Sequence, residues 1–94
     1  MKTVWISGRE IADKAELHRA LSRQLEFPDY YGANLDALWD VITTTDLDVT
    51  FLEVEPMLRA LGAYGCKLLS TFYEAAEENP GLTFRVGAAA EEEE

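Results

Sequence analysis

Three short runs of β-branched and aromatic residues, separated by much longer helical patterns, constrain the fold most strongly. TVWIS (residues 3–7), LDVTFLEVE (residues 47–55) and LTFRV (residues 82–86) each favour a strand. Because helical segments separate the strands, their connections are crossovers and the strands are parallel. The sequence therefore predicts an α/β fold, a three-stranded parallel sheet packed with about four helices. The first strand is expected to be buried on both faces.

Capping residues mark the first two helices. Asp13, with Glu16 three positions later, has the pattern of a capping box, and the helix that it begins should end before Pro28. Asn34 is a favourable N-cap for a second helix that runs to about Thr43.

Two further helices are expected in the second half of the chain. Pro56 suits the first position of a short helix that ends at Gly62. A longer helix should follow over residues 63–78, and Asn79 begins a turn before the last strand. The apolar stripe predicted for the longer helix comprises Cys66, Leu69, Phe72, Tyr73 and Ala76.

Length and charge narrow the class of protein. The 94 residues suit one domain, expected at residues 1–87, and residues 88–94 are expected to be a disordered acidic tail. A net charge of -10 disfavours nucleic acid and anionic membranes as partners and favours basic proteins. A single cysteine and the lack of a long apolar run predict a cytoplasmic protein without a membrane span.

The expected second helix carries two carboxylates on one face. At about 100° per residue, Asp36, Asp40 and Thr43 lie on the side away from the core, and Trp39 lies on the border. Like charges four residues apart destabilise a helix by about 0.2–0.5 kcal/mol, so a lysine at either position would be more favourable. On helix geometry alone, a solvated surface and a partner-binding surface remain equally open.

Catalysis and metal binding have little support in the sequence. Paired carboxylates serve glycosidases only within a cleft, which a small three-stranded sheet hardly provides. His18 is expected at the surface and Cys66 in the core, and one histidine with one cysteine cannot form a zinc site. Asp46 and Asp48 lack the other residues of a calcium loop. We therefore expect a protein that is not an enzyme and has no metal or cofactor.

The segment PDYYGANLDALWD (residues 28–40) resembles the signature of the barstar family, the intracellular inhibitors of barnase-type ribonucleases. TVWISG, ELHRALSRQLEFP and FYEAAEENPGLTFRV extend the resemblance over nearly the whole chain, except TTTDLD and the acidic tail. The resemblance implies a bacterial inhibitor that acts as a monomer. Its second helix and the preceding loop would plug the active site of a small, basic, secreted ribonuclease of the guanyl type.

The resemblance also implies roles for individual residues. Asp40 corresponds to the central carboxylate that enters the phosphate site of the enzyme, and Asp36 to a second carboxylate facing enzyme arginine. Tyr30 is similar to a tyrosine that lies against the catalytic histidine, and Glu74 to an outlying acid. The complete set of partner-binding residues that the resemblance implies is Tyr30, Tyr31, Gly32, Asn34, Leu35, Asp36, Trp39, Asp40, Thr43 and Glu74.

The chain departs from the family pattern after this helix. Thr45 and Leu47 stand where one characterised member of the family has a tryptophan and then a glutamate, and Asp46 and Asp48 are candidates to replace the acid. This departure affects the rim contacts and the identity of the partner. An alternative function therefore stays open: immunity against, or binding of, another basic protein or toxin through the same acidic face.

Overall fold

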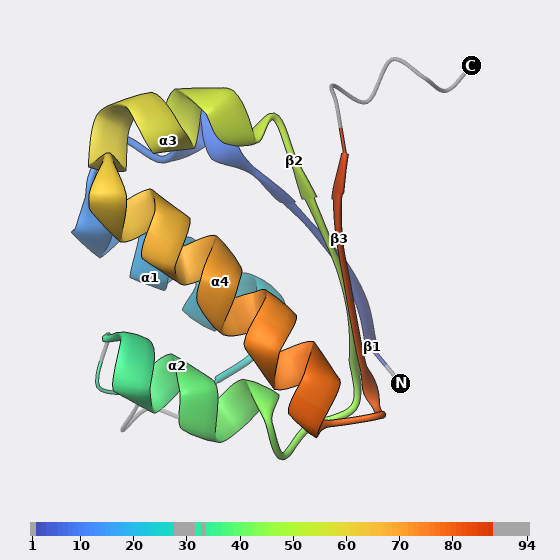
Figure 1. Ribbon diagram of the computed structural model, residues 1–94. Helices are drawn as coiled ribbons and strands as arrows, with labels where there is room; N and C mark the ends of the chain where they lie inside the picture. The colour runs from blue at the N-terminus through green and yellow to red at the C-terminus, as the bar shows by residue number, and fades with distance from the viewer. Residues whose placement is uncertain (1, 28–31, 33, 88–94) are drawn as a thin grey trace.

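The computed structural model describes residues 2–27, 32 and 34–87, and its strands and helices follow the predicted order (Figure 1). The strands are β1 (Lys2–Ser7), β2 (Leu47–Leu52) and β3 (Leu82–Gly87). The helices are a short 3₁₀ turn η1 (Gly8–Glu10), α1 (Lys14–Leu25), α2 (Leu35–Ile42), α3 (Val54–Leu61) and α4 (Ala63–Glu78).

The three strands form one parallel sheet in the order β1-β2-β3. In the register, Val4 of β1 pairs with Val49 of β2, which pairs in turn with Phe84 of β3. The two crossovers each contain two α-helices, as expected for parallel neighbours in a small α/β protein. The predicted three-stranded parallel sheet with four helices is confirmed.

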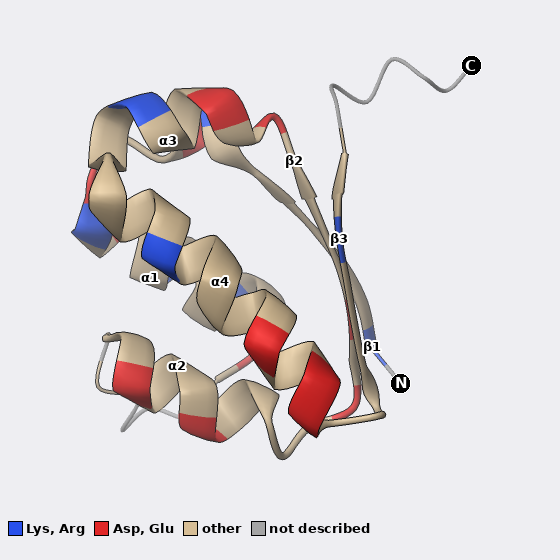
Figure 2. Cartoon of the chain, in the orientation of Figure 1, with Lys and Arg blue, Asp and Glu red and all other residues tan. Residues whose placement is uncertain are grey.

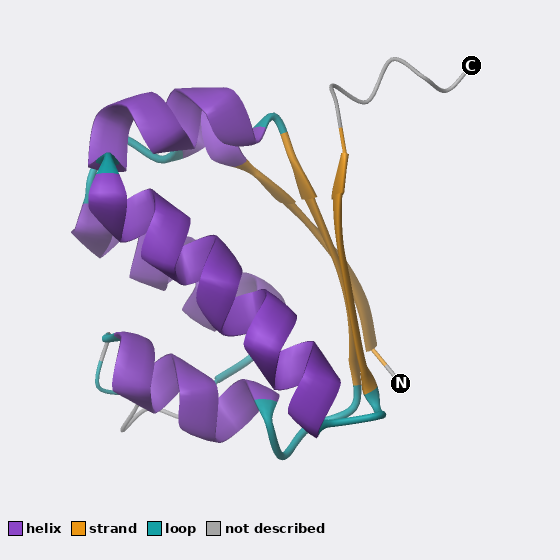
Figure 3. Cartoon of the chain, in the orientation of Figure 1, coloured by secondary structure: helices purple, strands orange, loops and turns teal. Residues whose placement is uncertain are grey.

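All four α-helices lie on the same side of the sheet, and the other face is open (Figure 3). Buried and exposed side chains alternate along β1 because neighbouring side chains of a strand point to opposite faces of the sheet. Val4 and Ile6 are buried, whereas Trp5 between them is 60% exposed. The prediction that the first strand is buried on both faces is therefore wrong, because no helix of the described chain covers the second face.

The core lies between the sheet and the four helices. Phe72 of α4 stacks on Phe84 of β3, with ring centroids 4.5 Å apart. The buried hydrophobic side chains are Val4, Ile6, Ile11, Leu17, Leu21, Leu25, Phe27, Leu38, Ile42, Leu47, Val49, Phe51, Met57, Leu68, Phe72, Ala75 and Leu82. Two of them, Leu38 and Ile42, belong to α2, so this helix is anchored by its inner face.

The buried stripe of α4 differs from the prediction by about one residue. It comprises Gly65, Leu68, Phe72 and Ala75. Cys66 is exposed and Tyr73 is 49% exposed, so the prediction that Cys66 lies in the core is wrong.

The close approach of α4 to α3 explains the difference. A Cβ atom built on Gly65 would lie 2.8 Å from the sulfur of Met57 and 3.0 Å from Leu58, so glycine allows this helix contact. A hydrophobic pattern does not register a glycine as a core residue, which is why sequence periodicity misplaces the stripe.

The end of β2 is also set by a tertiary contact. Glu53 adopts a left-handed conformation (φ 51°), ends the strand at Leu52 and starts α3 at Val54, so Pro56 stands third in the helix rather than first. The Glu53 carboxylate forms an ion pair with Arg9, with 2.8 Å between its Oε1 and the Arg9 Nε. A Cβ atom on Gly8 would lie 2.3 Å from the Glu53 carbonyl oxygen, so η1 packs directly on this corner. None of the helices in the described residues is both long and apolar enough to span a membrane.

Candidate partner-binding surface

The helix α2 begins at the predicted N-cap. The Asn34 side-chain oxygen accepts from the Ala37 N–H at 2.8 Å, and its amide nitrogen donates to the Gly32 carbonyl at 3.2 Å. The first hydrogen bond satisfies one of the four N–H groups that lack a partner within a helix. Asn34 and Gly32 therefore act in this structure by fixing the start of α2, and both are also exposed.

The two aspartates of α2 face solvent, as the helix geometry predicts. Asp36 and Asp40 are exposed, whereas Leu38 and Ile42 on the opposite side are fully buried. Figure 2 shows both acidic positions along α2, at the edge of the helical layer. Among the described residues, neither carboxylate takes part in an ion pair. Both charges are thus available to a cationic partner.

The side chains at the border of this face are partly buried. Leu35 and Trp39 pack against the core while part of each remains accessible. Thr43 is half-buried, and its hydroxyl donates to the Trp39 carbonyl at 2.6 Å, so it turns back onto its own helix. The apolar border can exclude water around the two carboxylates when a partner covers them.

A second acidic element adjoins α2. The helices α2 and α4 pack against each other, and the C-terminal half of α4 carries further acids beside α2 (Figure 2). Glu74, Glu77 and Glu78 are all exposed there. Glu74, predicted as an outlying contact, thus lies on the helix that supports α2. Tyr30 and Tyr31 fall outside the described residues.

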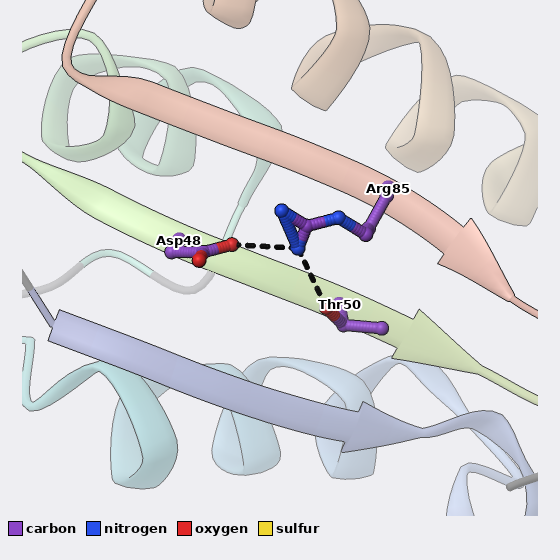
Figure 4. Close-up of polar contacts among 3 residues, drawn as sticks. All are labelled: Asp48, Thr50 and Arg85. Atoms are coloured by element: carbon purple, nitrogen blue, oxygen red, sulfur yellow. Dashed lines mark hydrogen bonds and ion pairs between the residues drawn. The ribbon is translucent and has the colours of Figure 1, made fainter. Parts of the chain in front are cut away.

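The segment after α2 gives different places to the two acids proposed to replace the family glutamate. Asp46 is exposed in the loop before β2, whereas Leu47 is buried in the core. Asp48 lies on the open face of the sheet, where Arg85 donates to it at 3.0 Å and also lies 3.4 Å from the Thr50 hydroxyl (Figure 4). Asp48 is therefore already paired, and on the face of the sheet opposite to the helices.

Asn79 is a residue of this region that sequence reasoning does not detect. The sequence predicts it only as the start of a turn. In the structure, its side-chain nitrogen donates to the carbonyls of Ile42 and Thr45, each at 3.0 Å. The local signal is that of a turn, and nothing near Asn79 in the sequence indicates carbonyl partners more than thirty residues away.

His18 and Cys66 take places opposite to those expected. His18 is buried, with 3% of its surface exposed, and its Nε2 lies 2.7 Å from the Tyr64 hydroxyl. The expectation that His18 lies at the surface is wrong, because α4 packs over this side of α1. Burial lowers the pKa of His18 below its ordinary value of 6.5 and raises the pKa of Tyr64. Cys66 is exposed on α4.

Two hollows of the surface lie away from α2. One, of about 450 Å³, lies between β1 and α1 and includes Trp5 and Arg19, and another, of about 710 Å³, surrounds the start of α3. Neither includes a residue of α2. Within the described part of the chain, no three His, Cys, Asp or Glu side chains are grouped to hold a metal ion. The acidic helix therefore presents its charges outside both hollows.

The fold and this surface define the class, a small α/β protein that presents carboxylates on the exposed face of one helix. Residues 1–89 match the family described as Barstar (barnase inhibitor), and the chain belongs to that family. A protein of Bacillus subtilis (strain 168), named "Putative ribonuclease inhibitor YrdF", is 42% identical over 81 residues, which cover 83% of this chain and 89% of that protein. The predicted resemblance is confirmed, and the family is one of inhibitors rather than enzymes.

Proposed function

We propose that this protein inhibits a small, basic, secreted ribonuclease of the guanyl type by inserting the acidic face of α2 into its active site. The observation that carries the proposal is the exposure of Asp36 and Asp40 on a helix whose other face is buried, in a chain of the Barstar family. Ribonuclease inhibition is the general function that family membership supports. The type of ribonuclease and the use of carboxylates in place of phosphates are the parts of the proposal that go beyond family membership.

The proposed chemistry is mimicry of RNA phosphates. A ribonuclease active site holds anionic substrate with cationic side chains, and arginine pairs with a carboxylate through two parallel hydrogen bonds. Asp40 and Asp36 would occupy phosphate positions without offering a bond that the enzyme can cleave. Trp39 and Leu35 would seal the rim of the contact, and Glu74 would meet a basic side chain at its edge.

Anchoring of α2 supports tight binding. Leu38 and Ile42 are fully buried, and Asn34 fixes the first turn of the helix. A surface that is already ordered loses less conformational entropy when a partner binds. The acidic charge of the chain also accelerates the encounter with a basic enzyme.

The test is an inhibition titration with purified barnase and an RNA substrate that contains guanosine. Wild-type protein should abolish turnover at a stoichiometry of one to one, as expected for a monomeric inhibitor. Asp40→Ala should weaken binding by about 30-fold or more, because it leaves enzyme cations unpaired in a desolvated site. Glu55→Ala is the matched control, because Glu55 is an exposed acid on α3. Equal affinities for Asp40→Ala and wild type would refute the assigned role.

The biological setting proposed for this activity is immunity. A cytoplasmic bacterial inhibitor would protect the cell that makes the ribonuclease before the enzyme is secreted. The same titration separates the alternative, a module that binds another basic protein or toxin. In that case the chain would leave barnase fully active at micromolar concentration.

A further inference from the structure

Asn79 joins three parts of the chain through one side-chain amide. Its nitrogen donates to the carbonyl of Ile42, the last residue of α2, and to that of Thr45 in the following loop, each at 3.0 Å. Its oxygen accepts from the Gly81 N–H at 2.9 Å, at the turn before β3. Asn79 is also the C-cap of α4, and its own N–H makes the last bond of that helix, to the Ala75 carbonyl at 2.8 Å. The amide is half-buried at the junction where α2 and α4 end (Figure 1).

These contacts complete the capping of α2. The last four carbonyls of a helix have no partner within it. Three of the four accept from the two threonines that follow the helix. Thr43 donates to Trp39, and Thr44 donates to Asp40 and Val41. The fourth carbonyl, that of Ile42, accepts from Asn79, the C-cap of α4. Local sequence thus caps most of this end, and one tertiary contact caps the remainder.

The C-terminal end of α2 needs such support because the negative charges of its side chains destabilise the helix. Asp40 lies in the last turn, where the partial negative charge of the helix macrodipole disfavours an anion, and this turn has no basic residue. Asp36 one turn earlier adds like-charge repulsion. A last turn that unwinds would move the Asp40 carboxylate relative to Asp36.

We propose that Asn79 is a positioning residue for the ribonuclease-binding surface, holding the last turn of α2 and the Thr45 loop against α4. It acts through Asp40 and does not itself touch the partner. This inference rests on the function proposed above. It also links the end of α2 to the end of the helix that carries Glu74, because Asn79 is the C-cap of α4.

The test is Asn79→Ala, which removes the amide without changing the charge of the chain. Binding to barnase should weaken by about three- to tenfold, through faster dissociation. The association rate should stay within about twofold of wild type, because electrostatic steering is unaffected. In an Asp40→Ala background, the effect of Asn79→Ala on affinity should shrink to less than about twofold.

Three controls separate positioning from a general loss of stability. Thr71→Ala removes another side-chain hydrogen bond of α4, from Thr71 to the Lys67 carbonyl at 2.7 Å, and should leave affinity unchanged. Ile6→Val should reduce thermal stability without changing the dissociation rate. Asn79→Asp retains the acceptor for the Gly81 N–H and loses the donors to the Ile42 and Thr45 carbonyls, so it should dissociate at least as fast as Asn79→Ala.

Hydrogen exchange in the free protein reports the same effect without a partner. The N–H groups of Thr43 and Thr44, which bond within the last turn of α2, should exchange faster in Asn79→Ala, while those in the first turn of α2 are unchanged. Wild-type dissociation rates in Asn79→Ala, or in Asn79→Asp, would overturn the positioning role even if Asp40→Ala loses binding. Failure of the wild-type protein to bind barnase would overturn both this role and the proposed function.

Discussion

The imidazole Nε2 of His18 lies 2.7 Å from the hydroxyl of Tyr64, and this hydrogen bond ties α1 to the start of α4. The two rings meet edge to face, with centroids 6.0 Å apart, and the Lys14 ammonium lies 4.5 Å from the centre of the Tyr64 ring. A protonated imidazole would thus be buried away from water. The two residues are 46 positions apart in the sequence, so only the packing of the helices brings them together.

This pair predicts a loss of stability in mild acid. Burial lowers the pKa of His18 in the folded chain, so the unfolded chain takes up the proton first. Stability is complete above about pH 6.5, falls as the pH drops below that value by at most about 1.4 kcal/mol per pH unit, and levels off below the folded pKa. Urea denaturation between pH 7.5 and 5.5 measures the slope. Glutamine in the His18→Gln variant does not titrate at this position. If the free energy of unfolding of this variant fell with pH in parallel with that of wild type, His18 would not be the cause of the loss of stability.

The two aspartates of α2 should differ in their effect on the free protein. Asp36→Asn and Asp40→Asn relieve the same mutual repulsion, so their difference reports the macrodipole alone. Asp36 in the first turn is favoured by the helix and Asp40 in the last turn is disfavoured. The free energy of unfolding should therefore be about 1 kcal/mol higher for Asp40→Asn than for Asp36→Asn. Thermal or urea denaturation measures this, and the reverse order would show that contacts other than the helix charge control the stability of α2.

Asp46 and Asp48 form a matched pair for the rim of the contact. Asp46→Asn should weaken barnase binding by up to about fivefold, because it is exposed in the loop that follows α2. Asp48→Asn should leave binding unchanged and reduce stability by about 0–1 kcal/mol, since its carboxylate pairs with Arg85 on the open face. Surface plasmon resonance on both variants checks the difference. If only Asp48→Asn weakened binding, the rim of the contact would lie on the open face of the sheet, and the role expected of Asp46 would be contradicted.

The association rate with a basic ribonuclease should fall steeply as salt rises. Exposed charges are screened beyond about 10 Å at 0.1 M ionic strength, so steering is greatest at low salt. Asp36→Asn should flatten the plot of association rate against ionic strength more than Glu55→Gln, which removes one charge from α3. Stopped-flow mixing between about 0.01 and 0.5 M salt measures both slopes. Identical slopes for the two variants would show that net charge, rather than the face of α2, governs the encounter.

Several features could be predicted because their causes are local. The Asp13 side chain caps α1 by accepting from the Glu16 N–H at 2.8 Å, and Asn34 caps α2 in the same way. The exposure of Asp36 and Asp40 follows from helical periodicity, since the apolar residues of α2 define a single inner face. The parallel sheet follows from the order of the elements.

Other features depend on which element packs where. Trp5 is exposed and His18 is buried because the helices cover one face of the sheet and α4 covers α1, and neither fact is visible within a few residues of either side chain. The buried stripe of α4 contains Gly65, which periodicity does not count as apolar.

The order of the elements, the caps of α1 and α2, the outward position of the acidic pair and the family of the chain could be read from the sequence, because hydrogen bonds and side-chain spacing within a turn act over a few residues. The packing of distant elements places Asn79 at the end of α2 from 37 residues away, and among the described residues it gives Asp48 an ion pair and Asp46 none. Such contacts form when distant segments are brought together by burial of a shared core, so local sequence carries no signal for them.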